Sequence, residues 1–332
     1  MENPSPKRDL HYEGWLTLRT PLLHGDSETL GNCRLFRSLK TVCEDGRVRR
    51  IPVYSGNAFR GKLRDLAAYQ LMEALQVQLP PPVFHFLTSG GALTAGGGQA
   101  IDVDRARALR KQIPMVGVFG GGVGSQILEG KLKVLPMTPI CRETVHLLPS
   151  YCRQAPSAGL SIRDLRQMDF GTRRDDSKRE SAQPYLEGGQ EAAAKRSDDE
   201  VSTSMIYENE VLIQGTCLRF GFVLEGATDR EWLCLGRALA GWLADPYLGG
   251  RSSAGYGEVA APSLFRSRRN LTFHQDAGEG ALIDLTRPLA SVESEVDLED
   301  RLEIAASGLD AAYRADVQAH REELIQGLRS VV

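Results

Sequence analysis

The order of strand-like and helix-like apolar patterns constrains the fold of this 332-residue chain more than any other feature. Alternating apolar residues predict strands at 12–20, 131–137 and 216–226, and a last strand follows the glycine-rich stretch 247–260. Apolar residues at helical spacing predict one helix from near Asn57 to Pro80 and a second that begins at Thr228. The order strand, helix, strand, strand, helix, strand predicts an α+β domain with the split βαβ arrangement, which is a modified RRM-like or ferredoxin-like fold.

Local signals indicate where the two helices begin. Ser55 or Asn57 can cap the first helix, because short polar side chains accept hydrogen bonds from free N–H groups. Thr228 is followed three residues later by Glu231, which is the pattern of a capping box.

Two stretches interrupt the predicted core domain. Residues 80–130 are glycine-rich, with one helical candidate at 102–112, and we expect an insertion rather than part of the core. Residues 157–207 are polar and charge-dense, which is typical of a mobile arm that orders on binding. The domain is therefore expected to span residues 1–275, and an acidic helical C-terminal segment is expected at 276–332.

Composition favours a globular protein of the cytoplasm. No apolar run reaches the ~18 residues that a membrane-spanning helix needs, and the polar N-terminus does not resemble a secretory signal. The six cysteines contain no C-x-x-C pair, so we expect free thiols and neither a metal nor a cofactor.

The charge is distributed unevenly along the chain. The net charge of −3 argues against a nucleic-acid partner, but residues 34–64 hold nine basic and two acidic residues. Residues 276–332 hold 13 acidic residues and five arginines. Such a distribution can hide a basic face within a neutral average, and it also suits head-to-tail association of identical chains. The ordinary alternative is two solvated faces.

Gly56 to Lys62 reads G-x-x-x-x-G-K, the nucleotide phosphate-binding loop without its final Ser or Thr. Leu63 replaces the hydroxyl that binds Mg²⁺, and the preceding stretch is too short and basic for a buried parallel strand. Arg60 and Arg64 share a helix face near the N-terminus, where the helix dipole attracts anions. We therefore favour the hypothesis that this helix start binds the phosphodiester backbone of a nucleic acid. The ordinary alternative is that these cations merely solvate the helix.

Three further segments carry cations, hydroxyl groups or aromatic rings in arrangements typical of a backbone clamp. They are the late loop GGRSSAGYGEV (249–259), a charged arm in the second insertion, and a turn with a histidine after the first strand. Each also has an ordinary explanation as a flexible turn, a disordered loop or a satisfied turn histidine. The predicted nucleic-acid-binding residues are His24, Arg34, Arg37, Ser55, Asn57, Arg60, Lys62, Arg64, Arg173, Arg174, Lys178, Gly250, Arg251, Ser252, Ser253 and Tyr256.

Taken in order, these segments resemble the backbone subunit of the RAMP superfamily of CRISPR effector complexes, most of all that of type IV effectors. The shared features are an early strand leading into the turn LLHGD (22–26), a helix start, and the late loop GGRSSAGYGEV. The helix start matches at Gly56, Asn57, Arg60, Gly61, Leu63 and Arg64. The resemblance covers about residues 12–264, and it implies a palm with a finger-like insertion at 80–130 and a thumb-like insertion at 157–207.

The resemblance also implies a role in defence against viruses and plasmids. Several copies would polymerise along the spacer of a CRISPR guide RNA, and base pairing would select the complementary target, with DNA favoured over RNA. The thumb would interrupt the guide–target duplex, with Met205, Ile206 and Tyr207 as candidate wedges. Other implied partners are a guide-processing endonuclease, a tail-end RAMP subunit, a large-subunit-like protein and a DinG-type helicase, and no membrane is implied.

No catalytic residue is predicted. Related type III backbone subunits carry a target-cutting aspartate in the loop after the first strand, where this chain has Asn32 and Cys33. Asparagine cannot act as a general base, and the sequence contains neither an H-x-x-x-H pair nor G-x-S-x-G. Two alternatives stay open: a metal-dependent ribonuclease that uses Asp26, and a nucleotide-binding protein that uses Gly56 to Lys62.

Overall fold

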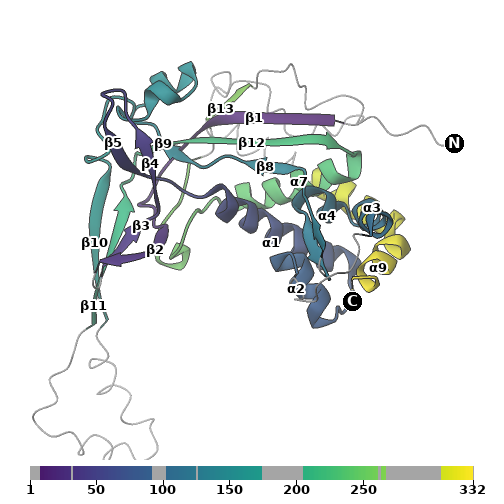
Figure 1. Ribbon diagram of the computed structural model, residues 1–332. Helices are drawn as coiled ribbons and strands as arrows, with labels where there is room; N and C mark the ends of the chain where they lie inside the picture. The colour runs from purple at the N-terminus through teal and green to yellow at the C-terminus, as the bar shows by residue number, and fades with distance from the viewer. Residues whose placement is uncertain are drawn as a thin grey trace, which may run out of the picture.

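The computed structural model describes residues 8–30, 33–91, 102–124, 126–173, 205–260, 263–266 and 308–331 (Figure 1). Its central sheet is antiparallel, with the strand order β13-β1-β12-β8, and β9 also pairs with β12. The strands are β1 (Arg8–Thr17), β8 (Leu132–Val134), β9 (Thr138–Pro139), β12 (Cys217–Ala227) and β13 (Ser263–Arg266). Helices α1 (Gly56–Leu75) and α7 (Asp229–Ala244) form the two crossovers. This is the predicted split βαβ order, and the α+β, RRM-like fold is confirmed.

Both crossover helices cover the same face of the central sheet (Figure 1). The ring of Phe59 on α1 lies 5.3 Å from that of Phe220 on β12 and 4.8 Å from that of Trp242 on α7. Both contacts are edge-to-face, which is a favoured geometry for buried aromatic pairs. Leu16 of β1 and Leu18, just beyond its end, are both buried in this core.

Residues from the segment 140–158 pack against one end of the opposite face of the sheet. Trp15 packs there in a smaller apolar cluster with Ile140 and Cys217, and its ring stacks on that of Tyr151 with centres 6.1 Å apart. At this end of the sheet, Trp15 of β1 and Cys217 of β12 are therefore buried on the face opposite the crossover helices.

The expectation that residues 80–130 lie outside the core is wrong. They form α2 (Pro81–Ser89), α3 (Val103–Gln112), α4 (Pro114–Phe119) and the hairpin of β6 (Gly121–Val123) and β7 (Gln126–Leu128). Phe86, Val116 and Phe119 are buried in the main core. The physical reason is that Pro81 and Pro114 occupy first helical positions, where proline starts a helix rather than ending one.

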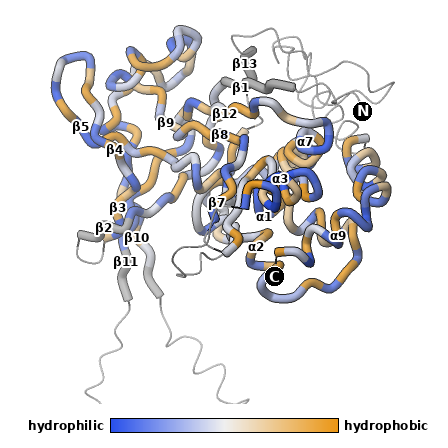
Figure 2. Tube along the Cα trace, turned by 45° about the vertical axis from the view of Figure 1, so that its right-hand side comes forward, coloured by the Kyte–Doolittle hydropathy of each residue, from blue (hydrophilic) through white to orange (hydrophobic). Residues whose placement is uncertain are grey.

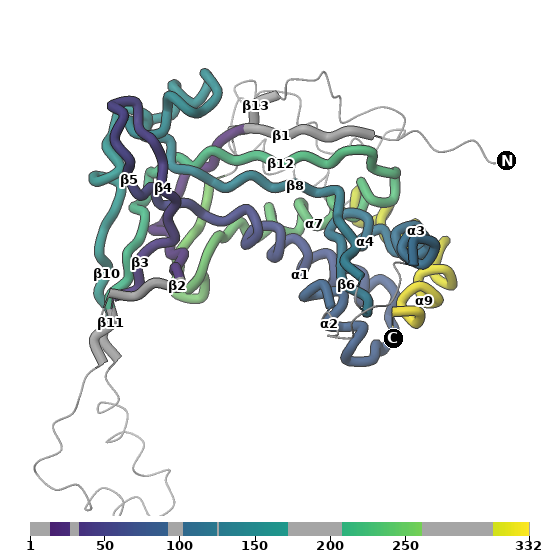
Figure 3. The backbone as a smooth tube through the Cα atoms, viewed as in Figure 1, coloured from purple at the N-terminus to yellow at the C-terminus, as the bar shows by residue number. Residues whose placement is uncertain are grey.

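A second sheet, with the order β10-β11-β3-β2, extends from the palm (Figure 3). It contains β2 (Gly25–Leu30), β3 (Cys33–Phe36), β10 (Arg166–Arg173) and β11 (Met205–Leu212). The stretch 157–207, expected to be an irregular arm, thus contributes two strands at its ends. Residues 174–204 lie outside the described residues. A further hairpin of β4 (Ser38–Val42) and β5 (Val48–Pro52) carries a mostly hydrophilic loop (Figure 2).

The C-terminal helices pack against the palm. Residues 308–319 are helical, and α9 (Arg321–Arg329) follows. Tyr313, Val317, Leu324 and Leu328 join the main core. Asp310 and Asp316 pair with arginines of α7, at 2.7 Å from Arg237 and 3.1 Å from Arg230. Within the expected C-terminal segment, helices are therefore found at 308–319 and 321–329, and they form an integral part of the core. Across the described ranges, no helix is both long and apolar enough to span a bilayer.

Candidate nucleic-acid interface

The late loop, residues 249–259, lies against the turn at 21–25 that follows the first strand (Figure 3). The N–H of Gly250 donates to the carbonyl of Leu23 at 3.0 Å. Gly249 has a φ of 72°, and a Cβ there would lie 2.1 Å from the Leu23 carbonyl oxygen. Only glycine fits such a position, so the late loop and the turn form one fixed junction.

His24 links this junction to the start of α1. Its Nε2 accepts a hydrogen bond from the N–H of Ser55 at 3.3 Å, and its ring centre lies 4.6 Å from that of Tyr54. Burial is the main cause that lowers the pKa of His24, followed by the charge of Arg37. The ring is therefore a neutral acceptor that fixes the helix start, and contact of His24 with RNA stays a prediction.

Substitution of His24 by glutamine is expected to flatten the pH dependence of stability. Because the folded-state pKa is lowered, the unfolded chain takes up the proton first, and stability falls as pH drops below about 6.5. The glutamine oxygen still accepts from Ser55 but does not titrate. Urea unfolding of both proteins at pH 7.5 and 5.5 measures the effect. An equal loss of stability in both would show that His24 is not the titrating group.

The basic residues at the start of α1 bind the protein's own backbone. Arg64 Nη2 donates to the carbonyl oxygens of Phe119 at 2.5 Å and Gly120 at 2.8 Å, and Arg60 Nη2 donates to Phe119 at 2.6 Å. These carbonyls form the C-terminal end of α4, where cations are favourable. Burial lowers the pKa of Arg64 to about 10, with the nearby charge of Arg60 as the second cause. These guanidinium groups therefore hold α4 in place, and RNA contact by them stays a prediction.

The remaining features of G-x-x-x-x-G-K also have internal explanations. Lys62 Nζ donates to the carbonyl of Tyr247 at 2.7 Å, and Leu63 is fully buried. A Cβ at Gly56 would lie 2.4 Å from the carbonyl oxygen of Val134, so this glycine permits α1 to approach β8. None of these contacts favours the nucleotide-binding alternative.

A third element, strand β10, reaches the late loop. The Tyr256 hydroxyl donates to Asp169 Oδ2 at 2.5 Å, and Arg251 Nη1 lies 3.9 Å from the same oxygen. Arg251 Cζ also lies 5.3 Å from the centre of the Tyr256 ring. The contact brings the base of the β10–β11 hairpin against two residues that the sequence predicted for nucleic-acid binding.

Arg34 lies on the same face of the second sheet as Asp169. Asp169 pairs with Asn209 across β10 and β11, and Asn209 pairs with Arg34 across β11 and β3. Directly paired residues share a sheet face. Arg34 is exposed, and Gly25 leaves room for it, since a Cβ on Gly25 would lie 2.4 Å from Arg34 Cδ. Arg34, Arg251 and Tyr256 thus belong to one connected region, which we call the junction face.

Several of the other predicted residues are exposed, namely Arg37, Asn57, Gly250, Ser252 and Ser253. Ser55 precedes α1 but makes no side-chain cap. Arg173 ends β10, but its side chain is outside the described part, as are those of Met205, Ile206 and Tyr207. Arg174 and Lys178 lie wholly outside the described residues.

Asp169 and Phe170 were not among the predicted site residues, because a mobile arm was expected at 157–207. Asp169 contacts the late loop, and Phe170, next to it on β10, has 64% of its surface exposed. An exposed aromatic ring is a surface on which a nucleobase can stack. The alternation of Met168 and Phe170 with Asp169 was the available signal for a strand.

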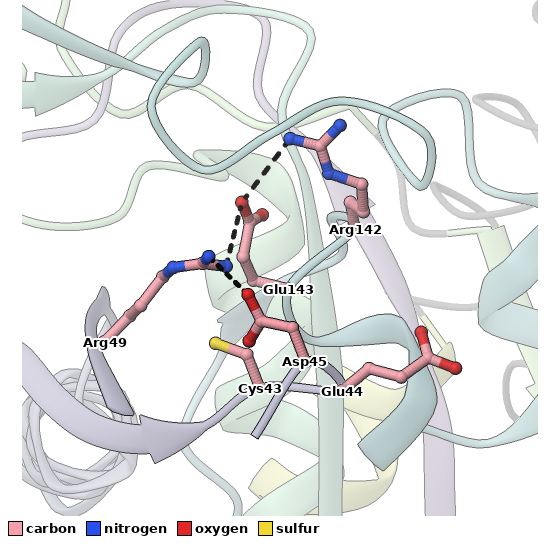
Figure 4. A pocket seen from close by; sticks show the side chains of 6 residues that line it. All are labelled: Cys43, Glu44, Asp45, Arg49, Arg142 and Glu143. Atoms are coloured by element: carbon pink, nitrogen blue, oxygen red, sulfur yellow. Dashed lines mark hydrogen bonds and ion pairs between the residues drawn. The ribbon is translucent and has the colours of Figure 1, made fainter. Parts of the chain in front are cut away.

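A cavity of about 450 Å³ lies away from the predicted site residues, between the β4–β5 loop and residues 142–143 (Figure 4). The guanidinium group of Arg49 lies 2.6 Å from the carboxylate of Asp45 and 3.8 Å from that of buried Glu143, so it links the two. The guanidinium group of Arg142 lies 3.9 Å from Glu143. Because opposite charges pair within it, this network ties the hairpin to the palm and gives no sign of a ligand.

The fold is similar to a chain of a solved structure described as "Type IV-B CRISPR Complex". The TM-score is 0.54, the sequence identity is 20%, and the match covers 80% of this chain and 95% of that chain. No protein-family model matches the sequence. No curated protein matches it either. At this level of identity the likeness establishes a shared fold.

Proposed function

We propose that this protein is a subunit of a CRISPR effector complex and that it binds guide RNA through the junction face. The observation that carries the proposal is the convergence of the late loop, the turn at 21–25 and the base of the β10–β11 hairpin. The fold shared with a chain of a type IV-B CRISPR complex supports the same role.

The exposed groups of the junction face suit an RNA backbone. Arg34 and Arg251 supply guanidinium groups, which bind phosphate oxygens in a bidentate geometry. Ser252 and Ser253 are exposed at the tip of the late loop and offer hydroxyl donors. Such groups recognise the phosphodiester chain but not its sequence, so target choice is left to base pairing. We propose that several copies assemble along the spacer, as in a backbone subunit.

We further propose that the subunit is not a nuclease. Asp26, the carboxylate of the ribonuclease alternative, lies close enough to His24 to raise that residue's pKa, in opposition to burial. Cys33, at the position following Asn32, is buried, and burial raises its pKa. Target cleavage that is lost in Asp26→Ala would favour the alternative.

The proposal is tested by expressing the chain alone and titrating it into labelled single-stranded RNA of unrelated sequences. We expect similar affinities for all sequences and a steep loss of affinity as salt rises. Absorbance at 260 and 280 nm, with sequencing of co-purified RNA, provides a second measurement. Failure to hold any RNA at low salt would refute the proposed function.

A further inference from the structure

The base of the β10–β11 hairpin contacts the late loop through one carboxylate. Asp169 Oδ2 accepts the Tyr256 hydroxyl at 2.5 Å and lies 3.9 Å from Arg251 Nη1. The side chains of Arg251 and Asp169 are 33% and 26% exposed. Because the carboxylate is partly shielded from water, this contact is screened less than a fully exposed one.

Arg251, which Asp169 contacts, has an unfavourable backbone conformation. Its φ is 61°, and it is one of two non-glycine residues with positive φ in the described ranges. The left-handed conformation is unfavourable for a non-glycine residue and persists where the surroundings impose it. Residues 252–255, which follow Arg251, are exposed, and the N–H groups of Ala254 and Tyr256 donate to the Arg251 carbonyl at 2.9 and 3.2 Å.

We infer that Asp169 is a positioning residue that orients Tyr256, and through its ring Arg251, for an RNA phosphate. The inference rests on the proposed function and deepens it. A carboxylate repels the anion, so Asp169 acts through the Tyr256 hydroxyl and does not touch RNA itself. Because Asp169 lies on β10, the placement of the hairpin and the shape of the late loop are coupled.

Substitution of Asp169 separates an acceptor role from a charge role. Asp169→Ala removes the acceptor and is expected to raise the Kd for single-stranded RNA about tenfold, which corresponds to the loss of one oriented contact with the RNA. Asp169→Asn keeps an oxygen acceptor and removes a negative charge, so it should bind at least as tightly as the unaltered protein. Asp104→Ala, at a side chain 95% exposed on α3, is the matched control and should change nothing.

A double-mutant cycle of Asp169 and Tyr256 measures whether their losses of RNA affinity are additive, which a general structural role of Asp169 would not affect. Tyr256→Phe keeps the ring and loses the hydroxyl, so it should weaken binding as much as Asp169→Ala. The double variant should be no weaker than either single variant, because both remove the same contact. Thermal unfolding of each variant checks folding, and Asp169→Asn and Tyr256→Phe still decide the matter should Asp169→Ala not fold.

Several results would overturn the inference. The inference is wrong if the losses of affinity in the cycle are additive, or if Asp169→Ala binds RNA as tightly as the unaltered protein. It is also wrong if Asp169→Asn loses as much affinity as Asp169→Ala. If the unaltered protein binds no RNA, the proposed function fails and this inference falls with it. If the unaltered protein binds and the cycle is additive, only the positioning role of Asp169 is wrong.

Discussion

Replacement of Arg64 by alanine is expected to lower the free energy of unfolding by about 2–4 kcal/mol, because it removes two charge-assisted hydrogen bonds. The carbonyls of Phe119 and Gly120 lose a donor at the end of α4, where further carbonyls already lack helical partners. Arg64→Lys should recover part of the loss, since one ammonium cannot reproduce the fork of a guanidinium. Urea unfolding followed by circular dichroism measures all three proteins.

The control for Arg64 is Arg107→Ala on α3, where the side chain is 76% exposed. A surface change of this kind should stay within about 0.5 kcal/mol. The RNA affinity of folded Arg64→Ala should remain near that of the unaltered protein. Unchanged stability together with a tenfold weaker RNA affinity would instead establish Arg64 as the phosphate-binding residue that its position on the helix start suggests.

Simultaneous replacement of Arg34 and Arg251 by alanine is expected to weaken RNA binding about 100-fold at low salt. Each charge-assisted contact contributes about 1.5 kcal/mol, or roughly tenfold in affinity. The slope of log K against log salt should also fall by about 1.4, because two phosphate contacts to a single strand are lost. Both arginines are at least partly exposed, so stability should change little.

Arg107→Ala again serves as the control for the double variant, since it removes a cation from the remote helix α3. It should leave both the affinity and the salt slope unchanged. An equal loss of affinity in the control would mean that net charge, and not the junction face, governs binding. An unchanged slope in the double variant would mean that neither arginine contacts a phosphate.

The fold was predictable where its signals are local. Alternation and helical spacing predict the central strands and the two crossover helices, and the predicted capping box of Thr228 and Glu231 is present. The strands β2, β3 and β4 were missed because the segment 21–40 is polar and turn-rich. Its pairing depends on distant residues, as in the parallel contact of β3 with β11.

The site was less predictable because its contacts are not local. Spacing places Arg60 and Arg64 on one helix face, but it cannot show that the end of α4 lies against that face. Tyr256 and Asp169 are 87 residues apart, and only the folded chain brings them together. The late loop was identified from composition, whereas its strain and its anchor became visible only in three dimensions.

Ultraviolet crosslinking of the protein to its bound RNA, with mass-spectrometric mapping of the crosslinked peptides, tests the central claim most directly. We expect crosslinks in the late loop at 249–259, with Tyr256 foremost, and in the neighbouring stretches 21–36 and 166–173. Crosslinks confined to α3 and residues 308–331, with none on the junction face, would contradict this account of how the protein binds RNA.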